Sequence, residues 1–246
     1  KEALKTQSPS LIVVECRMAF GDKEYYNEKD TFPVTFSYMD DLPLSWNKAE
    51  LALHSAPDLE GRVSALFNFM MYHNRWSDLH RSDFTFRRNQ ARDPYKGFVM
   101  LEPQDSPQPR PAIETVTRSA PLLGKNQYWL EEIIALCQEK GVELWLVKSP
   151  SNLELEEKAM LNTVEATAAQ NNVPFHDFNL DYMSIGLSED MFYDEHHLDA
   201  LGASQFTRYF AAVLTAARPG LETDPENPDW AADLKIYRAA LEALEG

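Results

Sequence analysis

The feature that most constrains the fold is a regular alternation of helix and strand patterns in the second half of the chain. Strands are expected over Val142–Val147 and near Phe175, and helices around 125–140, 153–171 and 201–217. Such an alternation with short connections is typical of a parallel sheet flanked by helices. The first of these helices shows the pattern best, since it ends at Gly141 and has apolar residues at helical spacing: Leu130, Ile133, Ile134 and Cys137.

The first half of the chain adds one strand and a long irregular stretch. The short aliphatic run Leu11–Val14 indicates a strand buried on both faces, as in a parallel sheet. Residues from about 20 to 120 are rich in aromatic residues, Pro and Asp, although the run Gly61–Leu79 is compatible with a helix. We therefore predict one α/β domain over 1–218 with an irregular insertion at about 20–120. A Pro-marked linker and an amphipathic helix follow over 219–246.

Composition excludes several classes of protein. The net charge of −16 disfavours binding of nucleic acid or anionic lipid by the bulk surface. No run approaches the roughly 20 apolar residues that a membrane-spanning helix needs. Cys16 and Cys137 lie in apolar runs, which favours two buried free thiols over a disulfide or a redox pair.

The sharpest motif is the segment FYDEHHLDALGA, which begins at Phe192. Asp194 precedes His197 by three residues, and Gly202 follows five residues later, where the last helix of the α/β unit begins. On one turn, the carboxylate can accept the Nδ1–H of the imidazole and leave Nε2 as a general base. Gly202 is expected to let the helix pack closely against the sheet. Loops that follow strands in such sheets line the ligand crevice.

Metal binding is the rival interpretation of this motif. Asp194, His196 and His197 are all capable ligands, but adjacent histidines on one turn do not easily face the same ion. The other histidines, His73, His80 and His176, lack a paired spacing such as H-x-x-x-H. We therefore expect no metal. A structural histidine at the start of the helix is the plainest alternative for His197.

The D-x-x-H-x-x-x-x-G pattern before a final helix resembles the last motif of the SGNH (GDSL-like) hydrolase superfamily. The stretch from Gly141 to Leu214 is similar to extracellular SGNH-type proteins of Gram-positive bacteria. Their relatives include the D-alanyl transfer protein of teichoic acid synthesis and polysaccharide O-acetyltransferases. YHNRW at 72–76 and YKGF at 95–98 also resemble clostridial members. The resemblance implies a flavodoxin-like, three-layer αβα fold with Asp194 and His197 as the catalytic pair.

The chain departs from the family pattern at the nucleophile. In this family a Gly-(Asp/Ser)-Ser block directly follows the first strand, and no such block is present. Lys1–Val14 looks like the helix and strand that come after that block. The family's Gly-x-Asn-Asp block is not evident either, because Cys16-Arg17-Met18-Ala19 follows Glu15. We expect an N-terminally incomplete domain, with its nucleophilic serine upstream or lost.

Other residues are candidates for substrate contact. In VKSPSN, Ser149 and Ser151 follow a strand but lack the glycines of a nucleophile elbow. A polar turn, with Ser151 or Asn152 capping the next helix, is the favoured interpretation. Lys148 is expected to line the crevice and meet an anionic group. Ser149, Tyr193, His73 and Arg75 complete the substrate-binding candidates, although core packing is an equal alternative for the last two.

The resemblance implies a serine esterase or O-acyltransferase that acts on acyl groups of cell-envelope glycans. Its substrates would be acylated polysaccharides or small acyl esters, and a membrane-bound acyltransferase would be its partner in acyl transfer. It implies no cofactor. The expected location is extracytoplasmic, with a membrane anchor N-terminal to this sequence. The alternative is an inactive SGNH-like module that binds envelope polysaccharide or a partner protein.

Overall fold

The structure is a computed structural model that describes residues 1–21, 39, 42–67, 81, 93–104, 107, 109–220 and 227–245. The chain divides into two compact units. The first comprises Lys1–Gln90 and Pro121–Trp145, and the second comprises Ala91–Ala120 and Leu146–Gly246.

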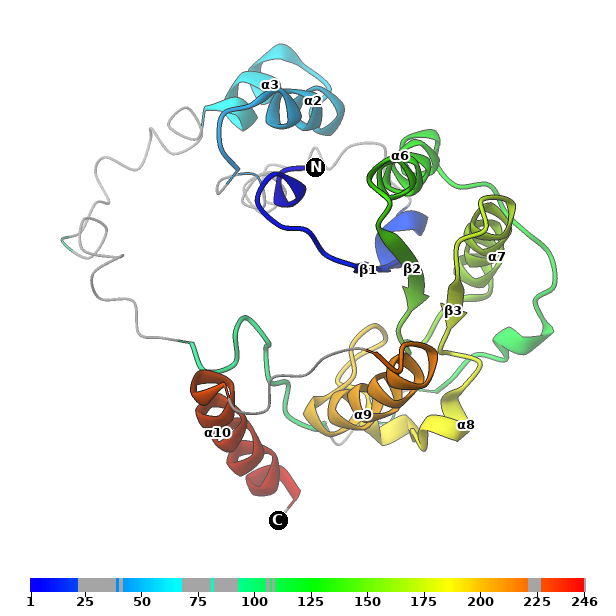
Figure 1. Cartoon of the computed structure of the whole chain (residues 1–246). Helices are drawn as coiled ribbons and strands as arrows, with labels where there is room; N and C mark the ends of the chain where they lie inside the picture. Colours follow the sequence, from blue (N-terminus) through cyan, green and yellow to red (C-terminus); the bar gives the residue numbers. More distant parts are fainter. Residues whose placement is uncertain are drawn as a thin grey trace. The chain divides into compact units, whose positions relative to one another are not determined.

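The first unit is mainly helical. Its described elements are η1 (Ala3–Lys5), β1 (Leu11–Glu15), η2 (Arg17–Phe20), α2 (Trp46–Ser55), α3 (Leu59–Leu66) and α6 (Gly124–Lys140). α2 and α3 pack against each other (Figure 1). Both begin at side-chain caps, because Ser45 accepts from Lys48 N and Asp58 accepts from Gly61 N.

α6 confirms the clearest helix prediction. It buries Leu130, Ile134 and Cys137, and it ends at Gly141 with φ of 64°. This left-handed conformation is strained for residues with a Cβ, which explains the glycine at this position. Val142 N then donates to Cys137 O, so the chain turns directly into the next strand. Cys137 and Cys16 are both buried free thiols.

The strands form a small parallel sheet in the order β1-β2-β3. β2 (Glu143–Lys148) is central, and Leu146 to Lys148 pair in register with Phe175 to Asp177 of β3. The α/β class and the parallel sheet are confirmed. One expectation is wrong: β1 is not buried on both faces, since Val13 is 38 % exposed. Among the described strands β1 has a partner on one side only, whereas Leu144 to Lys148 of β2 are all buried.

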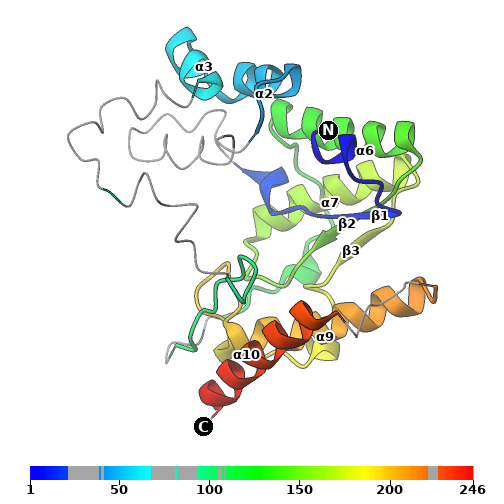
Figure 2. The same cartoon turned by 60° about the vertical axis from the view of Figure 1, so that its left-hand side comes forward.

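The second unit contains β3 and the remaining helices. These are η4 (Ile113–Thr115), α7 (Leu155–Gln170), α8 (Tyr182–Ile185), η5 (Glu189–Met191), α9 (Ala200–Ala217) and α10 (Pro228–Glu245). Figures 1 and 2 show α10 beside α9. α7, α9 and α10 lie where the sequence predicts helices. Phe206 and Phe210 of α9 pack edge-on against the buried Phe178, which follows β3.

α7 begins differently from the prediction. Neither Ser151 nor Asn152 is its cap, because the N-cap residue is Glu154, which forms a capping box with Glu157. The turn 149–152 therefore does not cap α7. Among the helices of the described ranges, none combines the length and the apolar character that crossing a bilayer requires.

Candidate functional site

The candidate site is a short closed loop at 192–198, directly before α9. An antiparallel bridge joins Phe192 to Leu198, and Tyr193 N donates to His197 O over 2.9 Å. Phe192 is 1 % exposed and anchors the loop in the core. The loop therefore holds the four residues of the DEHH segment between its own backbone contacts.

Asp194 and His197 form the predicted hydrogen bond. Nδ1 of His197 lies 2.9 Å from both carboxylate oxygens of Asp194. Asp194 Oδ1 also accepts the backbone N–H groups of His196 and His197, each over 2.8 Å. The ring of His196 lies at 76° to that of His197, with 6.5 Å between centroids. The carboxylate thus fixes the tautomer of His197, with Nε2 on the opposite side of the ring.

The pair is accessible to solvent. The side chain of His197 is 63 % exposed and that of Asp194 is 45 % exposed. Partial burial acts to raise the pKa of the Asp194 carboxyl, but the hydrogen bonds from the His197 ring and the two backbone N–H groups outweigh it. The pKa of Asp194 is therefore lowered. Within the described ranges, no serine hydroxyl bonds to the His197 ring.

Gly202 has a different role from the one expected. A Cβ at this position would lie 2.5 Å from Met191 O and 3.2 Å from Leu198 Cδ2. The glycine therefore lets α9 approach the 191–198 loop, and not the sheet. Asp199, the buried N-cap of α9, accepts from Gly202 N over 2.7 Å, and its own N–H donates to Met191 O.

The loops after β2 and β3 meet beside this site. Asn152 N donates to Glu195 O over 2.9 Å, which joins the 149–152 turn to the DEHH segment. Ser151 N donates to Asn179 Oδ1 over 2.8 Å, and Phe178 N donates to Lys148 O. Residues that follow two neighbouring parallel strands are thus brought together at the carboxyl edge, the usual place of a ligand crevice.

The substrate-binding candidates divide between exposed and buried positions. Tyr193 is 38 % exposed and adjoins Asp194, and Ser149 is half-buried. Lys148 requires a correction: it is 1 % exposed, and its Nζ donates to Ser149 O over 2.7 Å, so it has a structural role and does not line a crevice. Ser151 is buried, and its Oγ has no hydrogen-bond partner in the part of the chain that the structure describes. His73 and Arg75 lie outside the described residues.

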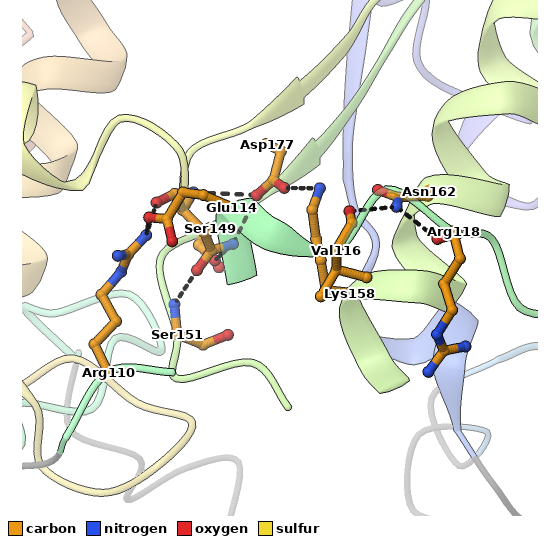
Figure 3. Close-up of polar contacts among 10 residues, drawn as sticks. Arg110, Glu114, Val116, Arg118, Ser149, Ser151, Lys158, Asn162 and Asp177 are labelled. Atoms are coloured by element: carbon orange, nitrogen blue, oxygen red, sulfur yellow. Dashed lines mark hydrogen bonds and ion pairs between the residues drawn. The ribbon is translucent and has the colours of Figure 1, made fainter. Parts of the chain in front are cut away.

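A buried ion pair, which was not predicted from the sequence, supports the turn 149–152. Lys158 Nζ lies 2.7 Å from Asp177 Oδ2, with side-chain exposures of 5 % and 3 % (Figure 3). Asp177 Oδ1 accepts from Asn179 N and Nδ2, and Asn179 in turn holds Ser151 N. The sequence carries one sign of this pair: Lys158 lies three residues before Leu161, on the apolar face of α7, where a lysine is rarely buried without a charged partner.

Arg110 joins the hydrogen-bond network of Asp177 and Asn179 at the end away from Lys158 (Figure 3). Its guanidinium donates to Asn179 O over 2.8 Å, pairs with Glu114 and lies 4.8 Å from the centroid of the Tyr182 ring. Burial raises the pKa of the Tyr182 phenol, and the negative charge of Glu189 adds to this increase. No cluster of three potential metal ligands occurs among the residues described.

Comparison with protein-family models, with curated proteins and with solved structures finds no match.

The lowered pKa of Asp194 predicts how the loop responds to acid. A carboxyl whose pKa is lower in the folded state stabilises the fold above its unfolded pKa of about 3.9. That contribution is lost as the pH falls through the lowered value. We expect the amide NMR signals of His196 and His197 to titrate together below pH about 3.9, and this transition to be absent in Asp194→Asn. Titration at or above the ordinary carboxyl pKa would contradict the observed hydrogen bonds.

Proposed function

We propose that the chain carries the Asp–His pair of a serine esterase or O-acyltransferase that acts on acyl groups of cell-envelope glycans. The observation that supports this proposal is the contact of His197 Nδ1 with both oxygens of Asp194. An imidazole bound in this way has Nε2 available as a base, which is the arrangement that activates a hydroxyl nucleophile.

In the proposed reaction, His197 Nε2 takes the proton of a serine hydroxyl as the serine oxygen attacks the acyl carbon. The ester C–O bond then breaks, and the same proton passes to the departing alcohol. Asp194 stabilises the imidazolium formed between these steps. Water or a glycan hydroxyl next attacks the acyl-enzyme, which releases the acyl group by hydrolysis or by transfer. No metal or organic cofactor enters this scheme.

The nucleophilic serine is itself part of the proposal. The family pattern places this serine N-terminal to the strand that corresponds to β1, and we assign it to sequence preceding Lys1. The proposal also includes the three-layer αβα fold, an extracytoplasmic location with an N-terminal membrane anchor, and a membrane-bound acyltransferase as the source of the acyl group. Acetyl and alanyl groups both fit this scheme.

An inactive SGNH-like binding module is the second candidate. It is favoured by the environment of His197, since within the described ranges Asp194 bonds to Nδ1 of the ring and no serine hydroxyl bonds to the ring. This candidate predicts an intact Asp194–His197 pair without hydrolysis.

The test is the esterase activity of the complete gene product on p-nitrophenyl acetate. His197→Ala should lower kcat/KM by at least about a hundredfold, because proton transfer by a positioned base is lost. The matched control is His196→Ala, whose backbone N–H still reaches Asp194 and whose activity should stay near wild type. Equal losses in both variants would contradict the role given to His197.

A second measurement separates the two candidates. At a pH where histidine is neutral, ¹⁵N NMR should show His197 with its proton on Nδ1, and Asp194→Asn should shift the proton toward Nε2. The expected tautomer together with measurable hydrolysis supports the enzyme. The same tautomer without hydrolysis of acetyl esters supports the binding module.

A further inference from the structure

A second candidate site lies in the same unit, between α10 and the turn that begins at Asp93. The carboxylate of Asp93 accepts the backbone N–H groups of Tyr95 over 2.9 Å and Gly97 over 2.6 Å. These bonds hold Lys96 at φ of 53°, a left-handed conformation that residues other than glycine and asparagine rarely adopt. The turn thus carries a local backbone strain, which is more frequent at ligand-binding positions than elsewhere.

The side chain of Lys96 reaches α10. Its Nζ lies 2.7 Å from Asp233 Oδ2 and 4.4 Å from the centroid of the Trp230 ring. The side chain of Asp233 is 8 % exposed, whereas that of Lys96 is 34 % exposed. A buried carboxylate and the face of an indole therefore already hold one ammonium group, and that ammonium can still reach solvent.

A cavity of about 380 Å³ adjoins this ion pair. Lys96 and Asp233 both line it, together with four aromatic residues and a few small or aliphatic ones; the aromatic residues are Tyr95, Phe98, Trp230 and Tyr237. Phe98 and Tyr237 meet edge to face with 5.9 Å between ring centroids. The volume falls within the usual range for small-molecule pockets. Aromatic walls around a carboxylate are the arrangement that recognises methylated ammonium groups.

We propose that this cavity binds a trimethylammonium group and that Lys96 is the resident cation that the ligand displaces. The lysine ammonium is compact and strongly hydrated, so it loses much hydration against aromatic rings. A trimethylammonium group is larger and more weakly hydrated, and it can contact several ring faces at once. The net charge of −16 further favours the approach of cations. None of the residues that carry this inference belongs to the Asp194–His197 site, so it does not depend on the proposed function.

The test is calorimetric titration of the full chain with choline, with indole NMR of Trp230 as a second readout. The uncharged control is 3,3-dimethylbutan-1-ol, in which carbon replaces the nitrogen of choline. We expect choline to bind and to shift the Trp230 signal, and the alcohol to bind at least about tenfold more weakly. Equal binding of the two compounds would show an apolar pocket and would overturn the proposal.

Lys96→Met separates displacement from simple contact. Removing the resident ammonium should tighten choline binding about tenfold, because no lysine side chain then has to leave the site before choline binds. Asp233→Asn should abolish binding, and Lys235→Met is the control, being a lysine of α10 that does not line this cavity. Weaker choline binding in Lys96→Met, with α10 still helical by NMR, would overturn the role of Lys96.

A comparison of choline with phosphocholine shows which natural compound supplies the trimethylammonium group. Comparable binding of the two indicates a phosphocholine headgroup, and weaker binding of phosphocholine indicates free choline.

Discussion

Lys158→Met is expected to lower the free energy of unfolding by about 3–5 kcal/mol, because it leaves a buried carboxylate without its cation. The partner, Asp177, has a side chain that is 3 % exposed and lies 2.7 Å from the lysine ammonium. Methionine keeps the unbranched apolar stem, so the change removes the charge with little loss of packing. Urea unfolding followed by circular dichroism measures the difference between the variant and the wild type.

The control for Lys158→Met is an ion pair that involves another residue of the same helix. Glu156 pairs with Arg118, but their side chains are 53 % and 57 % exposed. Water screens such a pair, and Glu156→Gln should leave stability unchanged within error. A Lys158→Met variant as stable as Glu156→Gln would show that Asp177 is satisfied without the lysine. The turn 149–152 should also loosen in Lys158→Met, because Asp177 holds Asn179, which holds Ser151 N.

Gly202→Ala is expected to destabilise the protein by about 1–3 kcal/mol and to displace the loop that carries Asp194 and His197. The new Cβ would lie 2.5 Å from Met191 O and 3.0 Å from Met191 Cβ. The nearest of these atoms belongs to the backbone, so a rotamer change cannot relieve the contact. Either α9 or the 191–198 loop must move, and a movement of the loop would change the surroundings of the His197 ring.

The matched control is Gly124→Ala, since Gly124 also lies in the first turn of a long helix. A Cβ there would meet no atom within 4 Å. Alanine favours the helix over glycine, so this variant should be neutral or more stable by up to about 1 kcal/mol. Thermal unfolding gives the two stabilities, and the ¹⁵N signals of His197 report the loop. Unchanged His197 signals and unchanged stability in Gly202→Ala would show that the helix adjusts without cost.

The elements predicted correctly are those whose signal is local in the sequence. The apolar spacing of Leu130, Ile134 and Cys137, with a glycine after the helix, was sufficient to place α6. The Asp194–His197 contact was predictable for the same reason, because the partners are three positions apart and one turn joins them.

The features that the sequence analysis missed depend on contacts between distant residues. Lys158 and Asp177 are 19 residues apart, and only the packing of α7 against β3 makes them partners. Lys148 ends a strand at a position that suits a crevice, but the fold turns its ammonium to the Ser149 carbonyl. The exposure of β1 likewise follows from its place in the strand order, which its aliphatic residues do not encode.

The 192–198 loop is closed by its own backbone contacts, from the Phe192–Leu198 bridge to the bond between Tyr193 N and His197 O. Asp194 and His197 are therefore oriented by contacts within the segment that contains them. Changes elsewhere in the fold can therefore move this segment as a unit without altering the pair itself. If the serine of the proposed reaction were absent, the imidazole and the carboxylate would still be aligned, so the aligned pair can exist without the proposed activity.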